Sequence, residues 1–340
     1  MRCVIGVDLG GTNVRAQAVY EDGSPAGGRV ENPSHAQSGT EEILDALSLT
    51  IQQAIDSAEN EVAGVGLAIP GHIDDAAGLV KWSPNFGKTE NGVFSYWKDV
   101  EIRRPLRERL GVDVKMANDA NCAALGEYLF GSGKGTAHCL VLFTIGTGVG
   151  GGVVFGEQSL FGNVSGPAML LGGNLGGGEL GHNIVQRNGL DCNAGSYGAL
   201  EAYCQRDAII TRAHHKLRRG RPSIIPDLLN GDLGKLSPAT LGEAAEMGDA
   251  LALEIWEEVG GYLGTAAGSM INIFAPDVLA IGGQISKSGK WFLPSVQAEA
   301  DKVAIPSLMR DCTICLADQV EDAGLLGGAA LVFIANRSQR

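Results

Sequence analysis

The sequence lacks an excess of basic residues. It contains 26 Lys and Arg against 39 Asp and Glu, so its formal net charge at pH 7 is −13. A chain this acidic repels phosphate backbones and anionic lipid surfaces. The sequence therefore predicts neither a nucleic-acid partner nor a membrane partner.

Long apolar runs and a leader segment are also missing. The longest uncharged stretch, residues 259–276, is interrupted by glycines, Ser269 and Asn272, so it predicts a buried helix rather than a membrane span. The N-terminus continues from Arg2 into a run of β-branched residues, without the charged, apolar and small-residue regions of a signal peptide. We expect a cytoplasmic protein.

The cysteines show no pairing pattern. They are odd in number and scattered, which is typical of small buried hydrophobic residues in a reducing compartment. Cys312 and Cys315 lie in a run that alternates like a strand, so we interpret them as core residues rather than a redox motif. We expect no disulfide among the seven, which are Cys3, Cys122, Cys139, Cys192, Cys204, Cys312 and Cys315.

What the sequence does contain is the pattern of a two-lobed α/β protein. Its 340 residues are too many for one small core. Two predicted hairpins, residues 4–7 with 14–20 and 140–145 with 148–155, each turn on Gly and Thr. Hydrophobic periodicity predicts the remaining elements: strands at 62–69, 112–116 and 278–281, and helices at 41–59, 96–110, 120–130, 199–218, 241–274, from 291 onward and at 325–336.

One segment has two interpretations. Residues 161–178 are rich in glycine and long enough to form a functional loop or lid. A flexible insertion without a role explains the same composition.

The first hairpin turn has the composition of a phosphate-binding turn. Gly10 and Gly11 lack side chains, so an anion can approach their backbone N–H groups, and Thr12 adds a hydroxyl donor. The Asp8 carboxylate would repel a phosphate unless a divalent cation lies between them, which suggests Mg²⁺, held through water. A tight hairpin capped by Asp8 is the structural alternative.

The second hairpin turn repeats this chemistry. Gly146, Gly148 and Gly151 satisfy G-x-G-x-x-G, so a dinucleotide-binding dehydrogenase has to be considered. That fingerprint requires a helix directly after the glycines, whereas residues 153–155 continue as a strand. A Walker A loop is excluded because no Gly-Lys-Ser/Thr follows a glycine loop.

Together these motifs resemble a known superfamily. The two turns are similar to the phosphate turns of the actin, sugar kinase and Hsp70 superfamily, and the intervening motifs resemble its ROK branch of repressors, open reading frames and kinases, especially the bacterial glucokinases. The resemblance spans nearly the whole chain. The matching segments are Asp8-Leu9-Gly10-Gly11-Thr12, residues 64–71, Ser83-Pro84-Asn85-Phe86, Asn118-Asp119-Ala120-Asn121, residues 146–152, Gly178-Glu179-Leu180-Gly181-His182 and Leu200-Glu201-Ala202-Tyr203.

The resemblance implies an α/β fold of two ribonuclease-H-like (actin-like ATPase) lobes with an interlobe active-site cleft. The small N-terminal lobe would comprise residues 1–117 and 321–340, because the last helix returns to it. The large lobe would comprise residues 118–320.

The resemblance also assigns roles to residues. Asp119 would be the catalytic base, although an acid just after a strand equally suits a helix N-cap. The implied sugar-binding residues are Asn85, Asn118, Asp119, Glu179, His182 and Glu201; for the last three, surface charge or a core imidazole are the alternatives. The implied ATP-binding residues are Asp8, Gly10, Gly11, Thr12, Asn13, Thr144, Gly146, Thr147, Gly148, Gly282 and Gly283, with Asp8 serving the metal.

One departure from the family concerns zinc. Many members hold a structural zinc with one His and three Cys; here His182 and Cys192 are present, but the other two positions are Ala194 and Ala199. A His and one thiol cannot close a tetrahedral structural site, so we expect no structural zinc. Asn193, Ser196 and Tyr197 are candidates to hydrogen-bond this loop instead.

The resemblance therefore implies an ATP- and Mg²⁺-dependent kinase that phosphorylates the 6-hydroxyl of a hexose, with glucose the leading substrate and a homodimer or homotetramer as the assembly. Fructose, mannose, allose and N-acetylmannosamine are alternative substrates, and polyphosphate is an alternative donor. A non-catalytic sugar-binding regulator is a second hypothesis. A repressor is a third, which the few residues ahead of Asp8 and the acidic charge disfavour.

Overall fold

The computed structural model describes residues 2–162 and 166–337. Residue contacts divide the chain into two compact units: the first takes the chain up to His138, residues 152–178 and the chain from Asp322 onward, and the second takes residues 139–151 and 179–321. Both contain sheets and helices, so the expected α/β class is confirmed. The lobe boundary expected at Ala117 stays a prediction; by contacts alone, residues 118–138 belong with the first unit.

The main sheet of the first unit has the strand order β3-β2-β1-β4-β8. β1 and β2 form the first predicted hairpin, while β1, β4 and β8 run parallel. The strands predicted at 62–69 and 112–116 are both present, the second shifted by two residues. The bounds are β1 (Cys3–Leu9), β2 (Asn13–Val19), β3 (Val30–Pro33), β4 (Val62–Ile69) and β8 (Val114–Asn118).

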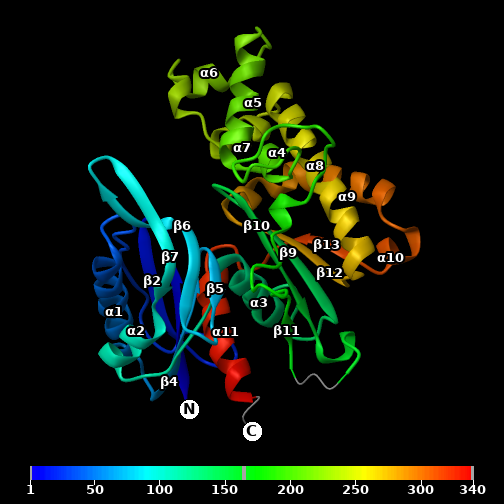
Figure 1. Ribbon diagram of the computed structural model, residues 1–340. Helices are drawn as coiled ribbons and strands as arrows, with labels where there is room; N and C mark the ends of the chain where they lie inside the picture. Colours follow the sequence, from blue (N-terminus) through cyan, green and yellow to red (C-terminus); the bar gives the residue numbers. More distant parts are fainter. Residues whose placement is uncertain (1, 163–165, 338–340) are drawn as a thin grey trace. The chain divides into compact units, whose positions relative to one another are not determined.

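Side chains of β1 alternate between the two faces of this sheet. The odd-numbered residues from Cys3 to Leu9 pack in the core that helix α1 (Thr40–Asp56) covers, whereas Val4 packs with α11 (Ala323–Arg337), the red helix of Figure 1. Gly6 also faces α11, because a Cβ on it would lie 2.2 Å from the Leu325 carbonyl oxygen. The last helix therefore returns to the first sheet, as expected, with its backbone directly against the strands.

A second sheet in this unit is absent from the sequence prediction. The strands β5 (His72–Asp74), β6 (Leu79–Glu90) and β7 (Val93–Glu101) form an antiparallel sheet, with β6 and β7 drawn as a long cyan hairpin in Figure 1. The helix expected over 96–110 is wrong in its first half, since only α2 (Arg103–Leu110) is helical. Trp97 accounts for this: its ring lies 5.2 Å from that of Phe86, and its Nε1 donates to Thr40 Oγ1 at 3.1 Å.

The second unit is built on three parallel strands, β9 (Cys139–Ile145), β12 (Val278–Gly282) and β13 (Thr313–Leu316). The second predicted hairpin joins β9 to β10 (Val149–Phe155), whose end pairs with β11 (Ala168–Met169). The helices are α3 (Asp119–Phe130) in the first unit and α4 (Glu201–Cys204), α5 (Arg206–Arg218), α6 (Ile225–Leu228), α7 (Pro238–Glu246), α8 (Ala250–Phe274), α9 (Gly289–Val303) and α10 (Pro306–Arg310) in the second.

Two helices expected to be continuous are broken. The one at 199–218 is split at Gln205, which is extended, because the next N–H, that of Arg206, donates to the Gly146 carbonyl oxygen at 2.9 Å. The one at 241–274 is split near Gly248, where φ is +81° and Asp249 caps the following helix by accepting the Ala252 N–H at 2.8 Å. Tertiary contacts and a cap end these helices although the apolar spacing continues.

The glycine-rich stretch at 161–178 is described only in part, since residues 163–165 lie outside the described residues. Its described part includes β11 and a turn in which the Gly177 N–H donates to the Leu171 carbonyl oxygen at 2.8 Å. Both interpretations of this stretch stay open. No helix in the described ranges is long and apolar enough to cross a membrane. The seven cysteines are free, five of them buried.

Candidate active site

Three predicted site residues, Asp8, Asn118 and Asp119, lie at one edge of the first sheet. β1, β4 and β8 are parallel, so Asp8, the Pro70-Gly71 turn and Asn118 all lie where the strands end. In open α/β sheets, ligands bind at the carboxyl ends of the strands. The fold thus places the first glycine turn and the Asn118-Asp119 pair at the edge where binding chemistry is expected.

The first glycine turn is open on its outer side. The Gly10 N–H donates to the Asn13 carbonyl oxygen at 2.9 Å, which closes the turn, and the Ser34 N–H donates to the Thr12 carbonyl oxygen at 2.9 Å, which anchors it. Gly11 and Thr12 are exposed, and a Cβ on Gly11 would meet no atom of the described residues within 4 Å. The turn can therefore receive a phosphate at its backbone.

Asp8 sits beneath this turn in an unusual environment. It faces α11, where a Cβ on Gly324 would lie 3.0 Å from its carboxyl group. Burial raises the pKa of the Asp8 carboxyl above its ordinary value, and the nearby charges of Arg15 and Arg29 offset part of the rise. Within the described part of the chain no hydrogen bond to this carboxyl is recorded. A half-buried carboxylate at this edge can face a hydrated divalent cation, so Asp8 suits the implied Mg²⁺.

Asn118, rather than Asp119, is the cap of helix α3. Its Oδ1 accepts the N–H groups of Ala120 at 3.0 Å and Asn121 at 3.1 Å, and its Nδ2 donates to the Gly71 carbonyl oxygen at 3.0 Å. One amide N–H of Asn118 is left for a ligand. Asp119 is the first residue of the helix, half-buried, with Oδ1 accepting the Ala120 N–H at 2.9 Å. The alternative interpretation, in which Asp119 is the N-cap of this helix, is therefore wrong.

The charges of Asp8 and Asp119 both act on the same neighbouring side chain, that of Cys122. Cys122 lies one helical turn after Asp119, and burial, together with the charges of Asp119 and Asp8, raises the pKa of its thiol well above the usual range. The two acids therefore contribute negative potential to the same part of the first unit. Such a concentration of carboxylates is suited to a cation and to a proton acceptor.

The second glycine turn is tied to the helices of its own unit. The Gly146 N–H donates to the Gly148 carbonyl oxygen at 2.9 Å, two residues ahead, whereas the bond that closes the first turn runs from Gly10 to Asn13, three residues ahead. The Val149 N–H donates to Glu201 Oε2 at 2.9 Å. Thr147 is exposed and Thr144 half-buried, so both hydroxyls are accessible to a ligand.

Gly282 and Gly283 adjoin this second turn. Gly282 pairs with Thr144 in the parallel register of β12 and β9. Gly283 has a φ of +83°, and a Cβ on it would lie 2.4 Å from the Ile145 carbonyl oxygen. Only glycine fits there. The ATP-binding residues predicted in the second unit therefore form one contiguous edge.

Three of the predicted sugar residues belong to the second unit, and two of these meet. Cys192 Sγ lies 3.6 Å from His182 Nδ1 and 3.8 Å from Glu201 Oε1. Glu179 is exposed, just before the short 3₁₀ helix Leu180–His182. Asn85 belongs to the first unit, where it is exposed on β6 at a register shift between Ser83 and Gly87.

The four-ligand zinc site of the family does not fit these residues. Ala194 and Ala199 carry no donor, and Ala199 is fully buried. The loop is closed instead by backbone bonds, such as Cys192 N–H to the Ser196 carbonyl oxygen at 2.8 Å, and by the Tyr203 hydroxyl, which accepts the Leu190 N–H at 2.8 Å. The expected side-chain bond from Ser196 is wrong, because its Oγ is buried without a partner among the described residues.

The sequence analysis did not identify two residues that lie against predicted site residues. Arg15 is the direct cross-strand partner of Asp8, which the two-strand register would have indicated once the turn length was known. Cys192, considered only as the remnant of a zinc site, touches both His182 and Glu201.

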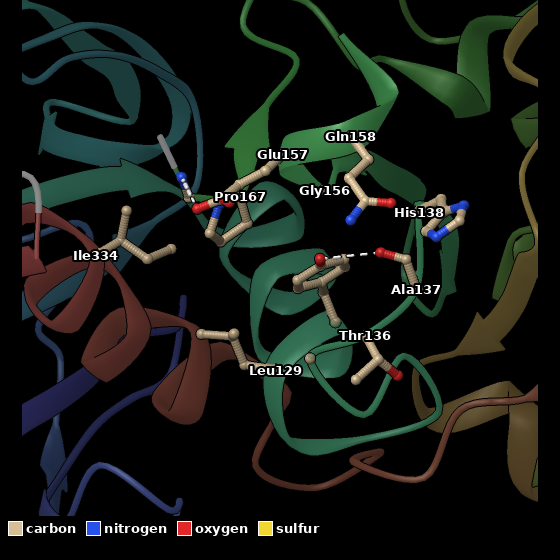
Figure 2. Close-up of a pocket in the computed structure, with 12 residues that line it drawn as sticks. Leu129, Thr136, Ala137, His138, Gly156, Glu157, Gln158, Pro167 and Ile334 are labelled. Carbon is tan, nitrogen blue, oxygen red and sulfur yellow. Dashed lines mark hydrogen bonds between the residues drawn. The ribbon is translucent and has the colours of Figure 1, made fainter. Parts of the chain in front are cut away.

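A pocket of about 500 Å³ in the first unit is lined by other residues (Figure 2). Two of its polar groups are already paired: the Tyr128 hydroxyl donates to the Ala137 carbonyl oxygen at 2.9 Å, and the Glu157 carboxylate accepts the Gly166 N–H at 2.6 Å. Leu129, Pro167 and Ile334 supply apolar walls. We assign it no part in the chemistry.

Known proteins similar to this chain include bacterial glucokinases. The glucokinase of Thermotoga maritima is 35% identical over 330 residues, covering 97% of this chain and 96% of its own. The glucokinase of Halalkalibacterium halodurans is 32% identical over 337 residues, covering 97% and 95%. A ROK family glucokinase structure from Streptomyces griseus, in complex with glucose and AMPPNP, is 27% identical with a TM-score of 0.77, covering 97% and 98%.

These likenesses extend over both units, and the actin-like ATPase fold of such kinases is the fold found here. The family model of the ROK family itself matches residues 4–334. The chain belongs to the ROK family.

Proposed function

We propose that this chain is an ATP-dependent hexose kinase that transfers a phosphoryl group to the 6-hydroxyl of its sugar, with glucose as the leading substrate. The carrying observation is the place of Asp119: it follows the end of β8 directly, and Asn118 relieves it of the capping role. The full-length likeness to glucokinases and to a ROK glucokinase crystallised with glucose and AMPPNP supports the same assignment.

In this mechanism Asp119 accepts the proton of the sugar 6-hydroxyl as its oxygen bonds to the γ-phosphorus. The bond from that phosphorus to the β,γ-bridging oxygen breaks, and ADP leaves with the electron pair. The Gly10 and Gly146 N–H groups close their own turns, so the backbone N–H groups of Gly11 and Thr12 in the first turn, and of Thr147 and Gly148 in the second, would receive phosphate oxygens. Mg²⁺ near Asp8, when bound, would neutralise phosphate charge.

We propose that the sugar is recognised by polar side chains that each form hydrogen bonds with one or two of its hydroxyl groups. Glu201 and His182 lie side by side in the second unit, Glu179 is near them in sequence, and Asn118 retains one amide N–H. Unsatisfied buried acceptors penalise the wrong epimer, so such a set can distinguish glucose from mannose or allose. Fructose and N-acetylmannosamine stay alternative acceptors, and polyphosphate an alternative donor.

The test compares the native chain with Asp119→Asn on a panel of hexoses with Mg·ATP. We expect ADP release with one preferred hexose, and a fall in kcat of about 10²–10⁴-fold in the variant with hexose binding retained, because only the proton acceptor is lost. Asp113→Asn is the matched control: its side chain is about half exposed, near the opposite end of β8. Equal turnover in native and Asp119→Asn chains would contradict the assignment.

The second candidate is a non-catalytic sugar-binding regulator, which the absence of two zinc-ligand cysteines favours. In the same experiment, hexose binding by calorimetry with no ADP release for any sugar would select it. The cytoplasmic location and the homodimeric or homotetrameric assembly stay predictions.

A further inference from the structure

Three metal-binding side chains converge in the second unit. His182 comes from a 3₁₀ helix, Cys192 from the loop that follows, and Glu201 from the first residue of α4. One ligand atom of each lies within 4.8 Å of those of the other two. The sequence indicated only two ligands here, because Glu201 was considered solely as a sugar-binding group.

The two separations that involve the Cys192 sulfur are those of a tetrahedral cation site. Zinc binds Cys sulfur at about 2.3 Å and His nitrogen or carboxylate oxygen at about 2.0–2.2 Å, so neighbouring ligand atoms on a tetrahedron are about 3.6 Å apart. The separations observed are 3.6 Å from Cys192 Sγ to His182 Nδ1 and 3.8 Å from Cys192 Sγ to Glu201 Oε1. The third pair, His182 and Glu201, lies within 4.8 Å, so small side-chain rotations would bring all three atoms to one cation.

The ligands are also held in place. Glu201 uses its other oxygen, Oε2, to accept the Val149 N–H at 2.9 Å, which orients Oε1 toward the thiol. Cys192 is only 5% exposed, and its backbone is fixed at both ends, N–H to the Ser196 carbonyl oxygen and carbonyl oxygen to the Gly195 N–H, each 2.8 Å. Supporting hydrogen bonds of this kind orient metal ligands and raise affinity.

We propose that His182, Cys192 and Glu201 form an open, three-ligand site for a thiophilic divalent cation such as Zn²⁺ or Cd²⁺. The thiol binds as thiolate and releases its proton to solvent, and water takes the fourth position. The sulfur and imidazole donors select such ions over Mg²⁺. This site differs from a closed four-ligand structural zinc, because one ligand is a carboxylate and one position is open.

One consequence rests on the proposed function. If Glu201 also binds the hexose, cation and sugar compete for the same carboxylate oxygen, and the cation inhibits the kinase by displacing the sugar. Glucose should then weaken cation binding to the same degree as the cation weakens glucose binding, since the linkage is reciprocal.

The direct test needs no activity. The full chain, freed of metal by a chelator and kept reduced, is titrated with Cd²⁺ while the thiolate-to-metal charge-transfer absorbance is followed. We expect one saturable site per chain. In Cys192→Ala the absorbance should disappear and Cd²⁺ affinity fall by more than about 100-fold, because loss of a ligand exceeds the effect of losing a supporting bond.

Two further variants make the result decisive. Cys312→Ala removes a thiol elsewhere in the same unit and should leave the titration unchanged. Glu201→Gln keeps the thiol but should weaken Cd²⁺ by at least about 10-fold, which covers the case in which Cys192→Ala does not fold. An unchanged titration in Cys192→Ala, or in Glu201→Gln, overturns the site.

Failure of this site and failure of the proposed function are distinguishable. Cd²⁺ binding through Cys192 in a chain that phosphorylates no hexose upholds the cation site and removes the kinase assignment. Hexose phosphorylation in a chain that gives no thiolate absorbance with Cd²⁺ upholds the kinase and overturns the cation site. Cd²⁺ binding that glucose leaves unchanged overturns the competition alone.

Discussion

At the scale of single residues, Asp8 shows how a proposed functional group opposes stability. Its side chain is half-buried against α11, and the loss of solvent there raises the pKa of the carboxyl above the ordinary value near 3.8. Because the folded state then holds this proton more tightly than the unfolded state, ionisation of Asp8 lowers the free energy of unfolding as pH rises through that window. At neutral pH the charged group is a destabilising one.

We therefore expect Asp8→Asn to raise the melting temperature at pH 7 by about 2–4 °C, the shift that about 1 kcal/mol produces in a protein of this size. The gain should shrink as pH falls through the folded pKa toward 3.8, since native Asp8 is then protonated. Thermal unfolding across a pH series measures it. Asp22→Asn is the control, because hydrogen bonds from Ser24 lower the pKa of exposed Asp22 and no stabilisation is expected. A gain that persists unchanged in acid would contradict the argument.

At the scale of elements, close contact between α11 and the first sheet depends on absent side chains. A Cβ on Gly66 of β4 would lie 1.8 Å from the Gly328 carbonyl oxygen, and one on Gly327 would lie 1.8 Å from the Cys122 carbonyl oxygen of α3. These neighbours are backbone atoms, which cannot rotate away. In the sequence these glycines suggest loops. In the structure they lie within a strand and a helix, where the absence of a side chain allows close packing.

Gly66→Ala should lower the free energy of unfolding by about 3 kcal/mol or more, because α11 must move off the sheet. Gly261→Ala is the matched control: it lies mid-helix in α8, where a Cβ meets nothing within 4 Å in the described part of the chain, and should add about 0.5–1 kcal/mol of stability. Denaturant unfolding of both variants measures these changes. Equal effects would show that helix propensity, rather than close packing, governs them.

The same scale explains which elements the sequence could predict. Strands β1, β4 and β12 and helix α3 were predictable, since each has an apolar run bounded by glycine, proline or a capping residue. The β6–β7 hairpin was not, because its alternation is interrupted by a register shift between Ser83 and Gly87. The break at Gln205 depends on a bond to Gly146, far away in sequence.

At the scale of the whole molecule, sugar binding should appear as added stability. A ligand present at 100 times its dissociation constant adds about 2.7 kcal/mol to the folded state. We expect glucose to raise the melting temperature of the native chain, and Glu201→Gln to lose most of that rise, because the carboxylate that we propose as an acceptor for sugar hydroxyls is gone. Thermal scans with increasing glucose measure this.

The control for this prediction is Glu246→Gln, whose carboxylate is mostly exposed at the end of α7 and pairs only with Lys290 in the recorded contacts of the described residues. It should keep the full glucose effect. If Glu201→Gln keeps it too, Glu201 serves the Val149 N–H rather than the sugar.

What the sequence by itself determined is the chemistry of its turns and the family. These features are local patterns, which depend only on residues close together in sequence. They are the two glycine turns with Asp8 and Thr12, the Asn-Asp pair after a strand, and the cysteine-poor loop. Tertiary structure alone decided which of these groups meet. It made Asn118, rather than Asp119, the cap of α3, placed Arg15 and α11 around Asp8, and brought Glu201 to Cys192 and His182. These outcomes depend on strand register and helix docking, which arise from contacts between residues distant in sequence.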